Sequence, residues 1–194
     1  MGRYLTMTLF CEGREDELFL TEVIGRQVGA LALSGRGFKM GDVQPQSCRT
    51  TRAAEQMDDA VREAVLAYDL VFLHNDHNER GKTDALRSRL AAARPARTRF
   101  VSVIPIRETE AWMLADSGVL PKDTATHGLP AKPRDVESVL DPKKLLATAL
   151  PRPLNPALAE QIGERISLDR LAQVPAYLNF RHDLENALKE LNFL

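Results

Sequence analysis

Apolar runs alternate with segments of helical spacing along the first 118 residues. Residues 4–11 (YLTMTLFC) are almost all apolar or β-branched, which predicts a buried strand. Residues 15–33 carry apolar side chains at helical spacing, with three acids in the first turn, where the helix dipole favours negative charge. Residues 34–49 are rich in Gly, Ser, Pro and Gln and predict a loop, with a short strand near 38–43. The same criteria predict helices at 50–68, 83–94 and 108–116 and strands at 69–73 and 100–106.

This alternation of strands and helices predicts an α/β fold with a mostly parallel sheet flanked by helices on both faces. After Gly118 the pattern changes, because repeated prolines divide the chain into short helices without a strand pattern. We therefore expect an α/β core over residues 1–118 and a helical extension over residues 119–194, packed together as one compact unit.

Composition narrows the class of protein. The chain has 194 residues and a net charge of −1, which disfavours a strongly basic nucleic-acid coat protein. Its two cysteines have no paired spacing, so neither a disulfide framework nor a zinc knuckle is indicated. The N-terminus lacks the apolar region of a signal peptide, and no run reaches the ~18 apolar residues of a membrane span. We expect a cytoplasmic protein without membrane contact; a homo-oligomer is an open alternative.

Acidic and amide side chains follow three of the predicted strands. They are Glu12, then Asp76 with Asn78, then Glu108 with Glu110. The carboxyl ends of parallel strands share one edge of a sheet, so these carboxylates would repel one another unless a cation joined them. Mg²⁺ prefers oxygen ligands, and we expect it here, with Mn²⁺ as the second choice. Each acid also has an ordinary alternative, as a solvated loop residue, a turn former or a partner of a helix N-terminus.

Other side chains near these acids have two interpretations each. His74 and His77 flank Asp76 and could bind a transition metal, although hydrogen bonding within the loop is the commoner role. Cys11 lies in a predicted strand and is expected to be an inert buried residue. Trp112 is expected to belong to the core rather than to a ligand site.

The motifs resemble the TOPRIM domain of topoisomerases, primases and overcoming-lysogenisation-defect nucleases. Glu12-Gly13-x-x-Asp16 follows a strand as the Glu-Gly of that family does, and the interval from Asp76 to Gly81 matches its Asp-x-Asp-x-x-Gly motif. Asn78 stands where the family usually has the second Asp. In an alternative register Asp76 is the second acid, and His74 replaces the first.

The resemblance is closer to a bacterial TOPRIM-like subfamily whose members contain segments similar to residues 104–116 and 171–180 and are often found beside ABC-type ATPases. It implies that Glu12 is a metal ligand or general base and that Asp76 and Glu110 are metal ligands, which makes these three the expected catalytic residues. Asn78 and Glu108 are further ligand candidates.

A basic run adjoins the Asp76 segment and would suit a phosphate backbone, although a solvated helix face is the ordinary interpretation. Its members are Arg80, Lys82, Arg87, Arg89, Arg94, Arg97 and Arg99. Arg80, Lys82 and Arg107 are the expected substrate-binding residues.

Three functions follow as hypotheses. The first is a metal-dependent phosphodiesterase, that is, a nuclease acting on DNA or RNA, in anti-phage defence. The second is a catalytically weak TOPRIM-like subunit that binds an ABC-type ATPase, which the uncharged Asn78 favours. The third is a small phosphotransferase or phosphatase that uses the same carboxylates.

Overall fold

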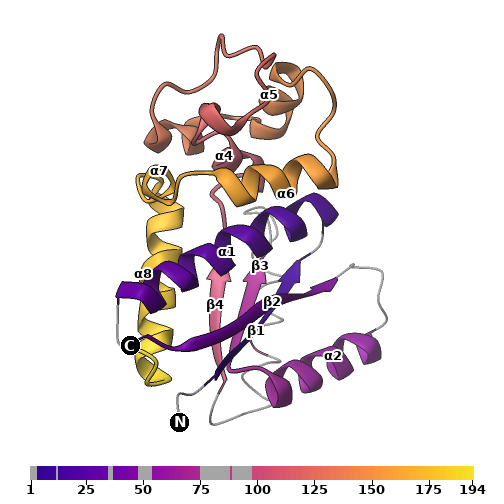
Figure 1. The fold of residues 1–194 in the computed structure, drawn as a ribbon. Coiled ribbons are helices and arrows are strands. Elements are labelled where there is room, and N and C mark those ends of the chain that lie inside the picture. The colour runs from indigo at the N-terminus through magenta and orange to yellow at the C-terminus, as the bar shows by residue number, and fades with distance from the viewer. Residues whose placement is uncertain (1–3, 12, 35–36, 48–53, 75–87, 89–97) are drawn as a thin grey trace.

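The structure is a computed structural model that describes residues 4–11, 13–34, 37–47, 54–74, 88 and 98–194. Four strands and the helices between them form the N-terminal part, and short helices follow (Figure 1). In chain order the elements of the N-terminal part are β1 (Tyr4–Cys11), α1 (Arg14–Ser34), β2 (Lys39–Ser47), α2 (Ala54–Ala67), β3 (Leu70–His74), β4 (Arg99–Val103) and α4 (Thr109–Met113). The later elements are the 3-10 helices η2 (Ser117–Val119) and η3 (Pro133–Ser138), then α5 (Pro142–Ala149), α6 (Pro156–Arg165), α7 (Leu168–Leu171) and α8 (Pro175–Glu190).

The four strands form one parallel sheet in the order β2-β1-β3-β4. β1 and β3 are the two central strands, and nearly all of their residues are buried because both faces of the sheet are covered. The chain therefore has the α/β architecture that the sequence predicts, with a parallel sheet flanked by helices and followed by a helical extension. This arrangement is consistent with a TOPRIM-like fold.

Each face of the sheet packs against different helices. The side chains of Leu5, Leu9 and Phe72 belong to a large apolar cluster with α1 and α8. Phe10 and Val71 point to the opposite face and pack with residues of α2. Figure 1 shows α1 crossing the strands, with α8 beside β4 and α2 at the lower right. Successive side chains of a strand point to opposite faces, so alternate residues of β1 and β3 belong to the two different clusters.

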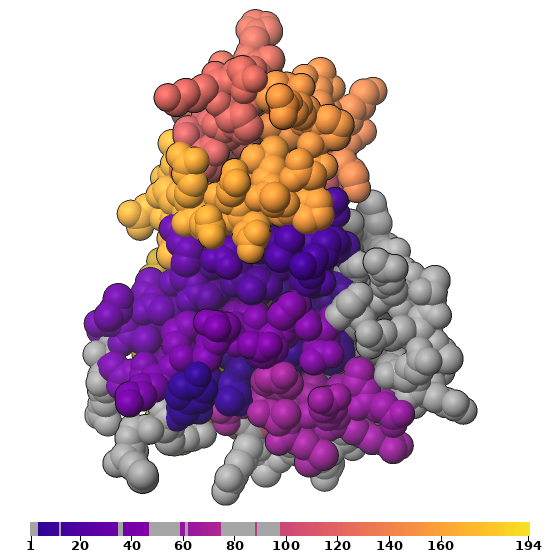
Figure 2. Space-filling view, turned by 45° about the vertical axis from the view of Figure 1, so that its right-hand side comes forward, coloured from indigo at the N-terminus to yellow at the C-terminus, as the bar shows by residue number. Residues whose placement is uncertain are grey.

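The extension shares the core of the sheet. Residues 119–194 contain no strand, as expected. Phe180 of α8 contacts both Phe72 and Trp112, and Tyr177 packs edge-on against Trp112 with ring centroids 5.2 Å apart. The Tyr177 hydroxyl donates a hydrogen bond of 2.8 Å to Gln27 of α1. Figure 2 shows the extension, orange to yellow, lying directly on the purple α1.

Close backbone packing holds α6 on α1. A Cβ on Gly163 would lie 2.7 Å from the carbonyl oxygen of Phe19, so the contact requires glycine. Arg26 of α1 donates hydrogen bonds to the carbonyl oxygens of Gly163 and Ile166, at 2.7 and 2.8 Å. A cation is favourable at this helix C-terminus, where carbonyl groups lack partners within the helix.

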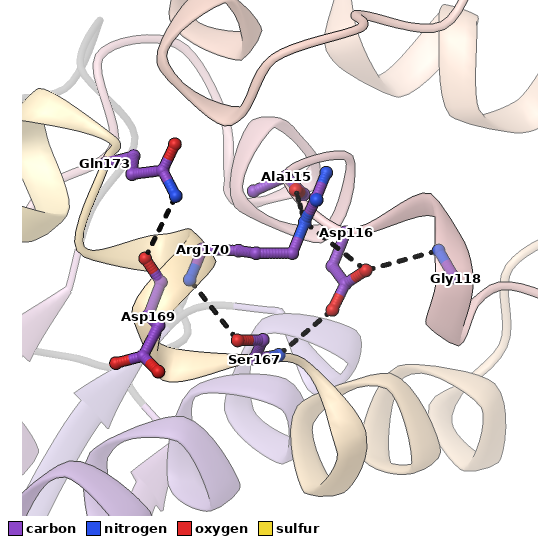
Figure 3. Close-up of polar contacts among 7 residues, drawn as sticks. All are labelled: Ala115, Asp116, Gly118, Ser167, Asp169, Arg170 and Gln173. Carbon is purple, nitrogen blue, oxygen red and sulfur yellow. Dashed lines mark hydrogen bonds and ion pairs between the residues drawn. The ribbon is translucent and has the colours of Figure 1, made fainter.

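Asp116 joins the core to the extension at a second point (Figure 3). One of its carboxylate oxygens accepts a hydrogen bond from the backbone N–H of Ser167, and the other accepts one from Gly118. Arg170 lies 3.4 Å from the same carboxylate and donates to the carbonyl oxygen of Ala115. The carboxylate thus ties the segment after α4 to the start of α7.

Three predicted elements need correction or fall outside the structure. β2 extends to Ser47, well beyond the expected short strand, because its backbone pairs with β1 along its length in spite of polar side chains. β4 ends at Val103, before Pro105. The predicted helix at 83–94 lies outside the described residues, apart from residue 88. Among the described helices, none has the length and apolar character needed to cross a bilayer.

Candidate functional site

Among the strands that the structure describes, the sheet order reverses between β1 and β3, which makes a topological switch point there. From β1 the chain continues to β2 on one side, and later it returns to place β3 on the other side. Phe10 pairs with Leu73, so the next residues, Cys11 and His74, end the two neighbouring strands. In open α/β sheets, ligands bind outside the carboxyl ends of the strands at such a point.

Three potential ligand side chains meet there. The Cys11 Sγ, a carboxylate oxygen of Asp16 and a ring nitrogen of His74 all lie within 4.8 Å of one another. Cys11 lies on the same face of β1 as Leu9, and His74 on the same face of β3 as Phe72, so both point toward the side that α1 covers. Cys11 and His74 are buried, while Asp16 is partly exposed. We call these residues the edge cluster; the group could hold a metal ion.

Hydrogen bonds define the orientation of the His74 ring. Its Nδ1 lies 2.9 Å from the carbonyl oxygen of Val103, which can only accept, so Nδ1 carries the proton. In the neutral ring Nε2 then has a lone pair, and it lies 3.2 Å from the Thr109 hydroxyl. A backbone carbonyl that fixes the tautomer in this way is a common outer partner of metal-binding histidines.

Gly13 allows Asp16 to reach the cluster. Residue 13 connects β1 to α1, and Asp16 lies in the first turn of that helix. A Cβ on residue 13 would lie 2.4 Å from Asp16 Oδ2, closer than real Cβ atoms approach. The absence of a side chain therefore determines where the carboxylate lies. Cys11 contacts the same turn, because its Sγ lies 3.6 Å from the Gly13 carbonyl oxygen.

A pocket of about 340 Å³ opens beside the edge cluster. Asp16 belongs to both the cluster and the pocket wall, and Glu110 and Lys143 line it from α4 and α5. Burial is the main reason that the pKa of Glu110 is raised to about 7; the charge of Asp16 acts in the same direction, while a backbone hydrogen bond and the charge of Lys143 act against it. The Lys143 Nζ lies 3.9 Å from Glu110 Oε1. The pocket thus combines a carboxylate, a proton-exchanging acid and a cation.

Glu108 and Arg107 lie near this pocket but do not line it. The Glu108 carboxylate accepts a hydrogen bond of 3.1 Å from the backbone N–H of Lys143, in the first turn of α5. This contact gives Glu108 the role of a helix N-terminus partner, the alternative that the sequence left open. Arg107 is exposed, next to the α4 start.

Most of the other predicted site residues lie outside the described residues. They are Glu12, Asp76, Asn78, Arg80 and Lys82, together with His77. Their described neighbours lie at the switch point, since Gly13 follows Glu12 and β3 ends at His74. His74 is the position that the alternative register assigns to the first acid of the family motif.

Sequence reasoning did not combine Cys11, Asp16 and His74 into one site. Cys11 is buried as expected, but it faces two other potential ligands. The signal that the sequence does offer is that the predicted strands 4–11 and 69–73 end at or just before Cys11 and His74. In a parallel sheet the carboxyl ends of the strands lie at one edge.

Comparisons with known proteins add no family assignment. No family model matches this chain, and no curated protein or solved structure matches it.

Proposed function

We propose that this chain is a metal-dependent phosphodiesterase that acts on DNA or RNA. The observation that carries the proposal is the meeting of three potential metal ligands at the switch point, beside an open pocket. Catalytic metal sites commonly have three protein ligands and leave a position open for water or substrate. The resemblance of the Glu12-Gly13 and Asp76–Gly81 segments to TOPRIM motifs supports the same class of reaction.

The residues around the pocket would have different roles in the reaction. A divalent cation, Mg²⁺ or Mn²⁺ by the sequence expectation, would supply positive charge that neutralises a phosphodiester and lowers the pKa of water. Asp16 would hold it with His74, and with Glu12 and Asp76 as further ligand candidates. Lys143 reaches the same pocket, where its ammonium group would contact a phosphate oxygen.

Glu110 is better suited to proton transfer than to permanent charge. The Glu110 residue is 7% exposed, and its carboxyl group has a pKa of about 7, so protonated and ionised forms coexist near neutral pH. A group with a pKa near the working pH is an effective general acid or base. In this proposal Glu110 exchanges the proton of the attacking water or of the leaving oxygen, a role that the resemblance to the TOPRIM family implies for Glu12.

A nucleic acid is the proposed substrate because it presents phosphodiesters in series. The basic run that begins at Arg80 and Lys82, and the exposed Arg107, would hold neighbouring phosphates. Action in anti-phage defence and association with an ABC-type ATPase are proposals from the resemblance alone.

The first test measures hydrolysis of bis(p-nitrophenyl) phosphate and of single- and double-stranded DNA and RNA, with Mg²⁺, Mn²⁺ or Zn²⁺ added to metal-free protein. We expect metal-dependent cleavage that Asp16→Asn lowers by more than about 100-fold, since even outer partners of a metal contribute about 10- to 100-fold. The matched control is Asp123→Asn, an exposed aspartate on a different pocket.

If the wild type cleaves no phosphodiester with any of the three ions, the proposal is wrong. Recovery of a stable, inactive complex with an ABC-type ATPase would then support the binding-subunit alternative. Equal loss of activity in both aspartate variants would mean that Asp16 has no special part in the reaction.

A further inference from the structure

The edge cluster combines three different donor elements. Cys11 offers sulfur, His74 offers nitrogen and Asp16 offers oxygen, within 4.8 Å of one another. Mg²⁺ prefers oxygen ligands and keeps several waters, so a thiol and an imidazole suit it poorly. Zinc and similar borderline ions accept all three donor types, and thiolate ligands select for them.

The geometry at His74 favours the same class of ion. Because the Val103 carbonyl oxygen fixes the proton on Nδ1, Nε2 carries the lone pair, and a metal would take this lone pair in place of the hydrogen bond from the Thr109 hydroxyl. The ring is buried, and its orientation is held by the backbone of the neighbouring strand β4. Because the fold already holds the His74 ring in place, metal binding would cost little side-chain entropy.

Charge balance is compatible with a divalent cation at this place. Without a metal the Cys11 thiol keeps its proton and donates it to the Gly13 carbonyl oxygen at 3.6 Å, and a bound divalent cation would replace that proton and offset the charges of the thiolate and of the Asp16 carboxylate. Within the described parts of the chain, no Lys or Arg forms an ion pair with Asp16. A bound divalent ion would neutralise both groups.

We infer that the ion of this site is a borderline transition-metal ion of the zinc class, bound through the Cys11 thiolate, and not Mg²⁺. The inference rests on the proposed function insofar as it names the metal of the same site. Cys11, His74 and Asp16 would be three protein ligands, and because Asp16 also lines the pocket, water or substrate would reach the ion from there.

Titration of the metal-free full chain with Co²⁺ tests the inference, because a thiolate bound to Co²⁺ gives a near-ultraviolet charge-transfer band. We expect this band in the wild type and in Cys48→Ser, which removes the other thiol of the chain, and its loss in Cys11→Ser and Cys11→Ala. Far-ultraviolet circular dichroism checks that the Cys11 variants are folded. Zinc-edge X-ray absorption of the wild type needs no variant and should show a sulfur neighbour at about 2.3 Å.

The outcomes separate this inference from the proposed function. A band that survives in Cys11→Ser, or a zinc spectrum with only oxygen and nitrogen neighbours, overturns thiolate binding. Mg²⁺-supported phosphodiester cleavage that is unchanged in Cys11→Ser also overturns it, while the proposed function stands. A sulfur-bound ion assigned to Cys11 supports the inference, and absence of cleavage with that ion would reject the proposed function alone.

Discussion

The exposed Lys143 ammonium group lies 3.9 Å from the buried carboxyl group of Glu110 at the wall of the pocket. The charge of Lys143 does not offset the effect of burial on the Glu110 carboxyl group, whose pKa still lies near 7. Removal of the carboxyl group from water is the largest cause, and the charges of Asp16 and Glu108 act in the same direction. The folded protein therefore holds this proton more tightly than the unfolded chain does.

A pH dependence of stability follows from this shift. Between pH 4.5, the ordinary pKa, and about 7, the folded state binds more protons at Glu110 than the unfolded state. The unfolding free energy should then fall as pH rises through this window, by up to a few kcal/mol at about 1.4 kcal/mol per pKa unit. Glu110→Gln should remove this part of the slope in urea unfolding measured at several pH values. Glu63→Gln, on the exposed side of α2, is the control and should keep it.

One experimental result would contradict the prediction for Glu110. If the wild type and Glu110→Gln lose stability in parallel from pH 4.5 to 7, the carboxyl group ionises without cost in the folded protein. It would then be a permanently charged group at neutral pH, and a metal ligand would be its more natural role.

Gly13 should control metal affinity more than stability. In Gly13→Ala the new methyl group would displace the Asp16 carboxylate, since the two would lie 2.4 Å apart. The end of a side chain can move at small cost, so we expect little change in unfolding free energy but about 10-fold or greater loss of metal affinity, as for other disturbed ligand shells. Calorimetric titration measures it. Gly25→Ala is the control, because nothing lies within 4 Å of its added Cβ.

The Asp116 junction should contribute measurably to stability. Asp116→Ala removes the acceptor for the Ser167 and Gly118 N–H groups and leaves Arg170 without its carboxylate. Hydrogen bonds to charged groups are worth about 1.5–3 kcal/mol each, so a loss of about 2–4 kcal/mol is expected in urea unfolding. Glu185→Ala breaks the i,i+4 pair with Arg181 and should cost no more than about 0.5 kcal/mol. Equal losses in the two variants would contradict the assignment of Asp116 as a structural junction.

The sequence predicts β1 and α1 almost to the residue because hydrophobic periodicity determines both. The apolar run ends at Cys11, and the helical spacing begins with the acids of the first turn. β2 is different, because GDVQPQS has no strand pattern of its own. Its strand conformation comes from pairing with β1 at the edge of the sheet, and a sequence does not state which strands pair.

Because strand pairing is not readable from the sequence, only part of the candidate site could be predicted. Glu110 is recognisable as an acid that follows a strand, and the structure places it in the pocket. The meeting of Cys11 with His74 depends on β3 lying next to β1, a fact of strand order. Asp16 reaches them only because Gly13 leaves space for its carboxylate, which is a fact of local geometry.

Gly163→Ala should weaken the attachment of the extension to α1. The added Cβ would lie 2.7 Å from the Phe19 carbonyl oxygen, which is a backbone atom of a long helix packed on the sheet and cannot move without the helix. The helices would have to separate, which also stretches the hydrogen bonds from Arg26 to the end of α6. Overpacking of this kind costs about 1–3 kcal/mol, against a gain of up to about 1 kcal/mol from helix propensity. Urea unfolding should show a net loss, whereas Gly29→Ala, with open space around its Cβ, should stabilise the chain. If Gly163→Ala were as stable as Gly29→Ala, the close contact between α1 and α6 would be wrong.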